Sequence, residues 1–442
     1  MNSRRLTNAL NDAQAGLPIT PAPALANAVR WIPAAERPIH RWFRYREGFS
    51  PALFDHLKTK GTRLDPFCGC GTTLVESARS GVRAYGIDVN PLATFITTTK
   101  TTPVNKRESV EFKRLTHQSL KSYRRFGPAQ APAFPLINKI FLPESLETLL
   151  RLRAFIDTVT SPRVRALLHL AWVSILEDCS NAFKEGNGLK YRNKRRRPGR
   201  YETVPDSTWI PKYFGISVRR FVENRWKEQC DAIASDLSDH PLPNSATTKV
   251  VTGSSLDARN LRFDEPASLA VFSPPYANRF DYFEAFKVEL WMGGFVNAAS
   301  ELGVLRKASM RSHLAAARGA SDSTWSRLSP FLSAMDSSAS SVRMGIKAAL
   351  AGYFDDTRTL LRGLHAALAP RATVAVVVGN SAYARSIIPT DTLVARIGQE
   401  EGYDVERVLV ARHLHVSSQQ RAHLGSLDEY MRESVVVLKS RA

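Results

Sequence analysis

Two short segments of the chain combine residue types that could bind a ligand and act on it. The first runs from Asp65 to Thr73 and contains Gly69 and Gly71 between an apolar strand and an amphipathic helix. Glycines at such a turn can take positive φ and let a ligand approach the backbone, while the helix N-terminus presents unpaired N–H groups to a carboxylate or a hydroxyl. The second segment, Ser273-Pro274-Pro275-Tyr276, offers a hydroxyl, a carbonyl oxygen whose direction proline fixes, and an aromatic ring. We therefore expect a cofactor cradle at the first segment and a set of hydrogen-bond acceptors at the second.

Strands of a parallel sheet are predicted to position both segments. A strand from Thr62 to Leu64 precedes the glycine turn, and a second strand ends at Asp88, about 20 positions further on, where an acid in dinucleotide-binding folds accepts hydrogen bonds from ribose hydroxyls. A third strand, Thr248 to Gly253, is followed by a fourth, Ser268 to Phe272, which delivers Ser273 at its carboxyl end. Open parallel sheets bind ligands beyond this edge, so the two segments are expected to share one site.

Both segments match known signatures. Asp65-Pro66-Phe67-Cys68-Gly69-Cys70-Gly71 resembles the D-P-F-x-G-x-G signature of the amino-methyltransferases, and Ser273-Pro274-Pro275-Tyr276 resembles their (D/N/S)-P-P-(Y/F) tetrapeptide. The resemblance is to the N-4/N-6 DNA methylase superfamily, specifically to the S-P-P-Y group that modifies the exocyclic N4 of cytosine. It implies an α/β, Rossmann-like class I methyltransferase fold with a seven-stranded, mostly parallel sheet and a reversed last strand. It also implies S-adenosyl-L-methionine as the cofactor.

The resemblance assigns roles to individual residues. Asp257 lies just past the third strand, where the superfamily hydrogen-bonds the adenine amine of the cofactor. Catalytic roles are implied for Ser273, Pro274, Pro275 and Tyr276. Cofactor binding is implied for Asp65, Pro66, Phe67, Gly69, Gly71, Thr72, Thr73, Asp88, Asn90 and Asp257.

The chemistry of a base amine explains why these residue types suit the reaction. The lone pair of an exocyclic amine is delocalised into the ring, but acceptors such as Ser273 Oγ and the Pro274 carbonyl can bind the amine hydrogens and make the nitrogen more tetrahedral. Tyr276 would stack on the base, which has to leave the double helix to reach the pocket. Carbon-5 methylation is disfavoured because it needs a thiolate nucleophile, carried in that family by Pro-Cys, and no Pro-Cys occurs here.

The charge of the chain points to a polyanionic partner. The formal net charge is +20 over 442 residues, which favours nucleic acid or an anionic surface. From Lys184 to Lys227 there are thirteen Lys and Arg against four Asp and Glu, accompanied by Gly, Pro and Asn, so we expect a mobile basic loop that contacts phosphates. The candidate DNA-binding residues are Lys190, Arg192, Lys194, Arg195, Arg196, Arg197 and Arg200.

Composition and periodicity suggest the organisation of the chain. Residues 1–36, rich in Ala, Asn and Pro, are expected to form a flexible arm, while 37–100 and 247–442 form the cofactor-binding catalytic domain. Residues 101–246 have helical apolar spacing and are expected to be a basic insertion that recognises DNA. The four cysteines lack C-x-x-C spacing, no histidine grouping suits zinc, and no apolar run approaches the length of a membrane span, so we expect no metal site and no membrane partner. Sparse cysteine favours a cytoplasmic protein, associated with the nucleoid while it acts on DNA.

The sequence therefore predicts a site-specific methyltransferase that acts on a flipped cytosine N4 in double-stranded DNA, with a restriction or defence protein as a candidate partner. The nearest alternative is N6-adenine methylation of DNA, because the association of serine with cytosine in the family is imperfect. More distant alternatives are an RNA amine methyltransferase and a nucleic-acid-binding subunit without catalysis.

Overall fold

A computed structural model of the chain describes residues 2–30, 36–45, 48–57, 60–185, 188–197, 200–215, 217–245, 247–278, 280–312, 325–335, 339, 342, 344–414 and 425–441. Within these residues no helix is both long enough and apolar enough to cross a membrane.

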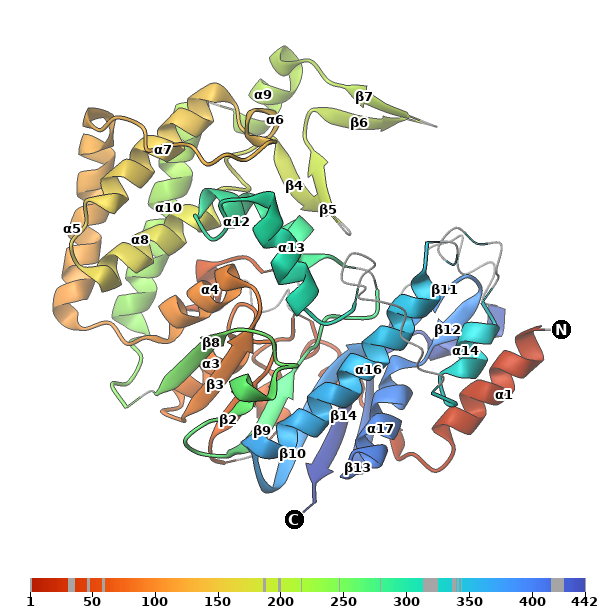
Figure 1. Cartoon of the computed structure of the whole chain (residues 1–442). Helices are drawn as coiled ribbons and strands as arrows, with labels where there is room; N and C mark the ends of the chain where they lie inside the picture. The colour runs from red at the N-terminus through yellow and green to blue at the C-terminus, as the bar shows by residue number, and fades with distance from the viewer. Residues whose placement is uncertain are drawn as a thin grey trace.

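An eight-stranded sheet forms the centre of the part of the molecule that lies outside the helical insertion (Figure 1). Across the sheet the strands are β1 (Ile19–Pro21), β13 (Tyr403–His413), β14 (Arg432–Ser440), β10 (Leu368–Gly379), β9 (Ala267–Phe272), β2 (Arg63–Asp65), β3 (Ala84–Asp88) and β8 (Thr248–Thr252). The strands from β10 to β8 pair in parallel, and β14 runs antiparallel to both β10 and β13. The expected mixed α/β fold with a mostly parallel sheet is confirmed, but the sheet has eight strands where seven are predicted, because β1 pairs with the outer edge of β13.

Helices cover both faces of this sheet. The helices outside the insertion are α1 (Asn2–Gln14), α2 (Leu53–His56), α3 (Thr72–Arg79), α4 (Pro91–Thr101), α11 (Tyr282–Ala285), α12 (Lys287–Met292), α13 (Ala299–Ala308), α14 (Ser329–Ser333), α16 (Ile346–Leu364) and α17 (Thr390–Glu400). Side chains alternate along a strand, so Val374, Val376 and Val378 of β10 pack in the cluster that holds α16 and α17. Ala375 and Val377 pack on the opposite face in a second cluster, which includes Phe49 and α2. Burial on both faces explains the apolar run at residues 374–378 within β10.

The N-terminal segment contains a packed helix, α1, where the sequence analysis expects a flexible arm. Leu6, Leu10 and Ala13 lie on one face of α1 and are buried in the same cluster as α14 and α17. Arg396 of α17 donates through Nε to the carbonyl oxygen of Ala13 at 3.0 Å. The spacing of these three apolar residues is that of an amphipathic helix, and the docking of this face outweighs the Ala- and Asn-rich composition that suggests disorder.

A helical insertion connects α4 to β8. Its helices are α5 (Lys106–Ser122), α6 (Ile137–Ile140), α7 (Pro143–Asp157), α8 (Pro162–Ser174), α9 (Asp206–Phe214) and α10 (Val218–Asp239). Trp172 and Trp226 are fully buried at its centre, and Trp226 Nε1 donates to Ser119 Oγ at 2.8 Å. The insertion begins and ends at one place, since the hydroxyls of Thr101, at the end of α4, and Thr248, at the start of β8, are 2.9 Å apart.

The basic segment forms two hairpins rather than the expected mobile loop. Strands β4 (Ala182–Glu185) and β5 (Gly188–Tyr191) pair antiparallel, as do β6 (Lys194–Arg197) and β7 (Arg200–Thr203). Figure 1 shows them projecting from the helical insertion. Hydrogen bonds between the paired strands hold this charged segment in an extended conformation. All the side chains of β6 and β7 are exposed, so their charges stay in solvent.

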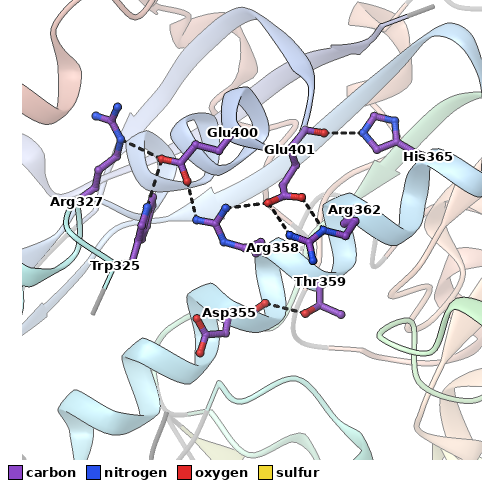
Figure 2. A network of polar contacts seen from close by, with 9 residues as sticks. All are labelled: Trp325, Arg327, Asp355, Arg358, Thr359, Arg362, His365, Glu400 and Glu401. Carbon is purple, nitrogen blue, oxygen red and sulfur yellow. Dashed lines mark hydrogen bonds and ion pairs between the residues drawn. The ribbon is translucent and has the colours of Figure 1, made fainter. Parts of the chain in front are cut away.

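A network of ion pairs fastens α16 to α17 on the outer surface (Figure 2). Arg358 pairs with both Glu400 and Glu401, and Arg362 pairs with Glu401 at 2.9 Å. Arg327, from outside these helices, also pairs with Glu400 at 3.1 Å. Single exposed pairs contribute about 0–1 kcal/mol, but the shared carboxylates here link three elements.

Candidate active site

A cavity of about 280 Å³ opens at the carboxyl ends of the central parallel strands. It is lined by nine of the residues that the sequence singles out: Asp65, Phe67, Gly69, Thr72, Asp88, Asn90, Ser273, Pro275 and Tyr276. The glycine loop after β2, the acid at the end of β3 and the S-P-P-Y loop after β9 therefore meet in one place. Among the described residues, Pro66, Gly71, Thr73, Pro274 and Asp257 are not part of the lining.

The glycine loop takes backbone conformations and close contacts that only glycine fits. Gly69 has φ +49°, and a Cβ there would lie 3.4 Å from the ring of Tyr45. Gly71, the residue before α3, has φ +89°, and a Cβ there would lie 2.9 Å from Thr97 Oγ1. That same hydroxyl donates to the carbonyl oxygen of Gly69 at 2.9 Å. Gly71 thus shapes the loop from behind, while Gly69 faces the cavity.

Asp65 and Thr73 hold the two ends of this loop together. Thr73 Oγ1 donates to Asp65 Oδ2 at 2.7 Å, and the Phe67 N–H donates to Asp65 Oδ1 at 3.0 Å. Burial raises the pKa of the Asp65 carboxyl to about 7, although both hydrogen bonds lower it. Both oxygens of Asp65 are engaged within the loop, so this residue shapes the cradle.

Asp88 is fixed by the backbone on both of its oxygens. The Gly69 N–H donates to Oδ2 at 2.9 Å and the Asn90 N–H donates to Oδ1 at 2.8 Å. Burial outweighs these hydrogen bonds and raises the pKa of the carboxyl to about 6. The carboxylate is held at the cavity wall and keeps lone pairs that can accept hydroxyl groups.

Asn90 presents an unpartnered donor at the same wall. Its Oδ1 accepts from the Leu92 N–H at 3.0 Å and caps α4, with Pro91 as the first helical residue. Its Nδ2 is buried and has no hydrogen-bond partner among the residues that the structure describes. A buried amide without a partner is costly, so the site suits a ligand that brings an acceptor to this position.

Asp257 lies outside the cavity lining, and its side chain is turned toward its own loop. Its side chain caps the short helix at Ala258–Leu261 and accepts from Arg259 Nη2 at 2.6 Å. This exposed pairing holds the pKa of the Asp257 carboxyl at about 2. Its position after the third strand is as predicted, but the adjacent arginine and the helix start engage its oxygens.

Residues of β14 and β13 anchor the S-P-P-Y loop on the side away from the glycine loop. The Tyr276 hydroxyl donates to Glu433 Oε1 at 2.8 Å, and Arg412 Nε donates to Glu433 Oε2 at 2.6 Å. The Tyr276 ring lies over Gly379 of β10, where a Cβ would come within 3.1 Å of it. Tyr383 completes the anchor by donating its hydroxyl to the Ala277 carbonyl oxygen at 2.7 Å.

Several lining residues are absent from the sequence-based site. Arg412 lies near the end of β13 and Glu433 near the start of β14, and knowledge of the antiparallel pairing of these two strands could have placed both residues at the cavity. Tyr45, which precedes the glycine loop in the chain, also lines the cavity. Its ring stacks on Phe286 with ring centroids 4.6 Å apart.

The basic hairpins present most, but not all, of the predicted DNA-binding residues to solvent. Exposed side chains are those of Lys190, Lys194, Arg195, Arg196, Arg197 and Arg200. A groove between the hairpins combines three of these cations with aromatic rings; its lining is Phe183, Glu185, Leu189, Lys190, Tyr191, Lys194, Arg196 and Tyr201.

Arg192 differs from the other predicted DNA-binding residues, because its side chain is engaged within the protein. It is half-buried, donates to Tyr213 Oη at 2.7 Å and to the Ala182 carbonyl oxygen at 2.9 Å, and lies over the Tyr213 ring. Its neighbours in sequence are exposed, but its strand-end position turns its side chain toward α9. Arg192 holds the hairpins to the helices.

Comparisons with known proteins agree with these signatures. No protein-family model matches the chain. The Type II methyltransferase M.BsoBI of Geobacillus stearothermophilus is 25% identical over 448 residues, which cover 90% of this chain and 85% of the relative. The Type II methyltransferase M.AvaI of Nostoc sp. is 23% identical over 405 residues, which cover 85% of this chain and 81% of the relative.

Two further likenesses are shorter or weaker. The Type II methyltransferase M.MvaI of Kocuria varians is 50% identical over 40 residues, 9% of each chain. An rRNA methyltransferase structure from Streptomyces viridochromogenes aligns over 97% of this chain and 92% of that one at 11% identity, but its TM-score of 0.26 is too low to support a shared fold. Over most of its length the chain is thus similar to Type II methyltransferases, in agreement with the signatures of its glycine and S-P-P-Y loops.

Proposed function

We propose that this chain is an S-adenosyl-L-methionine-dependent DNA methyltransferase that modifies the exocyclic N4 of a flipped cytosine in a specific duplex sequence. The observation that carries the proposal is the convergence of Gly69, Asp88 and Ser273 on one cavity. Two Type II methyltransferases similar over most of the chain support methyl transfer to DNA. The serine of S-P-P-Y supports cytosine over adenine.

The residues at the β2 and β3 end of the cavity fit the cofactor. Asp88 can accept hydrogen bonds from ribose hydroxyls, and the unpartnered Asn90 Nδ2 can donate to an acceptor on the same ligand. Gly69 leaves the backbone open beneath the ligand, and Tyr45 offers a ring beside it. When bound, S-adenosyl-L-methionine supplies an electrophilic methyl group on a sulfonium sulfur.

The residues at the β9 end prepare the amine. Ser273 Oγ and the Pro274 carbonyl oxygen accept the amine hydrogens, which directs the nitrogen lone pair toward the cofactor end of the cavity. The Tyr276 ring supports the face of the base. Positioning contributes most of the rate, because the acceptor needs only to be held in line and at contact distance. No strong general base is required, since the proton leaves after the nitrogen has been methylated.

Catalysis and target recognition are assigned to different parts of the chain. Residues 37–100 and 247–442 form the catalytic domain, a class I methyltransferase sheet with the reversed strand β14, and β1 from the N-terminal segment adds a strand at its edge. The insertion within 101–246 is the target-recognition region. Its exposed hairpin cations contact phosphates, and the aromatic groove between the hairpins approaches bases. A restriction or defence protein that recognises the same DNA sequence is the expected biological partner.

The test is mass spectrometry of nucleosides from plasmid DNA of a methylation-free host that expresses the chain. N4-methylcytosine is expected with the wild type and is expected to be lost in a Ser273→Ala, Tyr276→Ala variant. An Arg259→Ala variant, which alters only the exposed partner of Asp257, serves as the control and is expected to keep the product. N6-methyladenine in place of N4-methylcytosine would refute the choice of base, and the absence of any modified base would refute DNA methylation.

A further inference from the structure

The cavity has a second end that the glycine loop and Asp88 do not reach. It is formed where β10, β14 and β13 end beyond the S-P-P-Y loop, and Arg412 and Glu433 belong to its lining. The residues proposed to bind the cofactor come from β2, β3 and the turns that follow them, with Tyr45 beside Gly69. A base whose amine lies at Ser273 therefore extends its remaining ring atoms toward β13 and β14.

Glu433 is a buried carboxylate held by two donors. Its side chain is 5% exposed, and it accepts from the Tyr276 hydroxyl and from Arg412 Nε. Glu433 lies directly across from Arg412 in the β13–β14 ladder and from Gly379 in the β10–β14 ladder. The Tyr276 ring and the Arg412 guanidinium are thus fixed by the same carboxylate, in a defined relation to each other.

Arg412 keeps donors available to a ligand. Within the described residues its guanidinium is hydrogen-bonded only through Nε, and the side chain is 30% exposed at the cavity wall. A guanidinium stays protonated and has no acceptor, so the group it meets on a ligand has to be an acceptor. Burying the Glu433 carboxylate is costly unless it is paired, and a charged pair at a cavity wall is a candidate for ligand recognition.

The ring edges of the two candidate bases differ at this point. Cytosine carries the O2 carbonyl oxygen beside N3, whereas adenine has a C–H in the corresponding position next to N1. The Arg412 guanidinium has only hydrogen-bond donors, so it can pair with the O2 carbonyl oxygen of cytosine. Against the C–H of adenine one of its donors would stay unpaired. On the proposed cytosine chemistry, on which this inference rests, we propose that Arg412 reads the O2 carbonyl of the flipped base and that Glu433 positions both Arg412 and Tyr276 for this contact.

The experiment removes the carbonyl from the base and the guanidinium from the protein in turn. Once the target sequence has been found by sequencing methylated plasmid, two duplexes are made. One carries cytosine at the target position, and the other carries the C-nucleoside of 2-aminopyridine, which keeps the ring nitrogen and the amine but has hydrogen in place of O2. Methyl transfer to each duplex gives kcat/KM for the wild type, Arg412→Met and Arg412→Lys.

The wild type is expected to prefer cytosine over the analogue, and Arg412→Met is expected to reduce that preference about tenfold or more, because a site built for a hydrogen bond loses discrimination with its donor. Arg412→Lys is expected to keep part of the preference. Unchanged S-adenosyl-L-methionine affinity and thermal midpoint would show that the variants are folded.

Two results would overturn the assignment. The first is a wild type that methylates both duplexes equally well, a comparison that needs no variant. The second is an Arg412→Met enzyme that is slower on both duplexes by the same factor, as expected for a phosphate contact. A wild type that forms no N4-methylcytosine on the natural duplex would instead refute the proposed function, and the O2 contact with it.

Discussion

Lys184 in the first basic hairpin forms a buried ion pair with Glu289 in α12, the helix that follows the S-P-P-Y loop and α11. The same ammonium binds Glu177 at 2.8 Å and lies 4.9 Å from the centre of the Phe286 ring. Burial alone would lower the pKa of Lys184, but the two carboxylates outweigh it and raise the pKa. Phe286 stacks on Tyr45, which lies against Gly69. The proposed DNA-binding hairpins and the cofactor end of the cavity are therefore joined by direct contacts.

Replacing Lys184 with Met is expected to destabilise the fold by about 3–5 kcal/mol, because the buried Glu289 carboxylate loses its charge partner. Urea denaturation followed by tryptophan fluorescence measures this loss. The double variant Lys184→Met, Glu289→Leu removes both charges and is expected to recover much of the stability. A single variant as stable as the wild type would show that the pair does not hold the hairpin to α12.

The affinity for S-adenosyl-L-methionine is expected to rise with pH through about 6. The pKa of the Asp88 carboxyl is raised to about 6, so the free protein holds it protonated below that pH. Ribose hydroxyls donate best to the ionised form, so each pH unit below 6 weakens binding by up to about 1.4 kcal/mol, and binding releases a proton. Titration calorimetry from pH 5 to pH 8 measures the slope. Asp88→Asn is expected to bind more weakly and to lose this dependence, and an equal slope in that variant would assign the titration to another group.

Gly71→Ala is expected to disturb the cradle more than its backbone conformation alone explains. At φ +89° an added Cβ is strained, and it would also press on the Thr97 hydroxyl that holds the Gly69 carbonyl. Gly16 is the matched control, because it has φ +72° with nothing within 4 Å of a Cβ. Gly16→Ala is expected to cost about 1–2 kcal/mol and leave cofactor binding unchanged. Gly71→Ala is expected to cost about 1–3 kcal/mol more and to weaken cofactor binding, and equal effects of the two variants would show that Thr97 does not constrain the loop.

Replacing Arg195, Arg196 and Arg197 together with Gln is expected to flatten the salt dependence of DNA binding. Each lost phosphate contact lowers the slope of log K against log salt by about 0.9. Fluorescence anisotropy with a labelled duplex at several salt concentrations measures the slope. The control replaces Arg327, Arg358 and Arg362, which removes the same charge from the network in Figure 2. A slope lowered equally by both triple variants would show that net charge, not the hairpins, sets the binding.

Much of the candidate site can be predicted from sequence, because its parts are local. The glycine turn, Asp88 and Ser273 each follow an apolar strand, and parallel strands bring their carboxyl ends to one edge. Arg412 and Glu433 escape prediction because their importance depends on the pairing of two strands and on the hydroxyl of a distant tyrosine. Asp257 lies outside the cavity lining, and a neighbouring arginine, which a strand-based pattern does not take into account, engages its side chain.

In the fold, too, local patterns can be predicted from sequence, whereas features that depend on distant contacts cannot. Strands and helices with a clear apolar period, such as β10 and α17, are predictable, whereas the basic hairpins are not, because cross-strand hydrogen bonds rather than side-chain burial extend them. Arg192 looks like its exposed neighbours in sequence, and only the packing of α9 reveals its structural role.

The contact between Thr101 and Thr248 has a consequence for the order in which the chain acquires its structure. Strands β3 and β8 are neighbours, yet their paired residues are about 160 positions apart, so bringing them together in an unfolded chain carries a large loop-closure entropy. Once the insertion has folded around Trp172 and Trp226, its two ends lie side by side, and most of that entropy has already been lost. We therefore expect β8 to pair with β3 late in folding, after the helical insertion has formed.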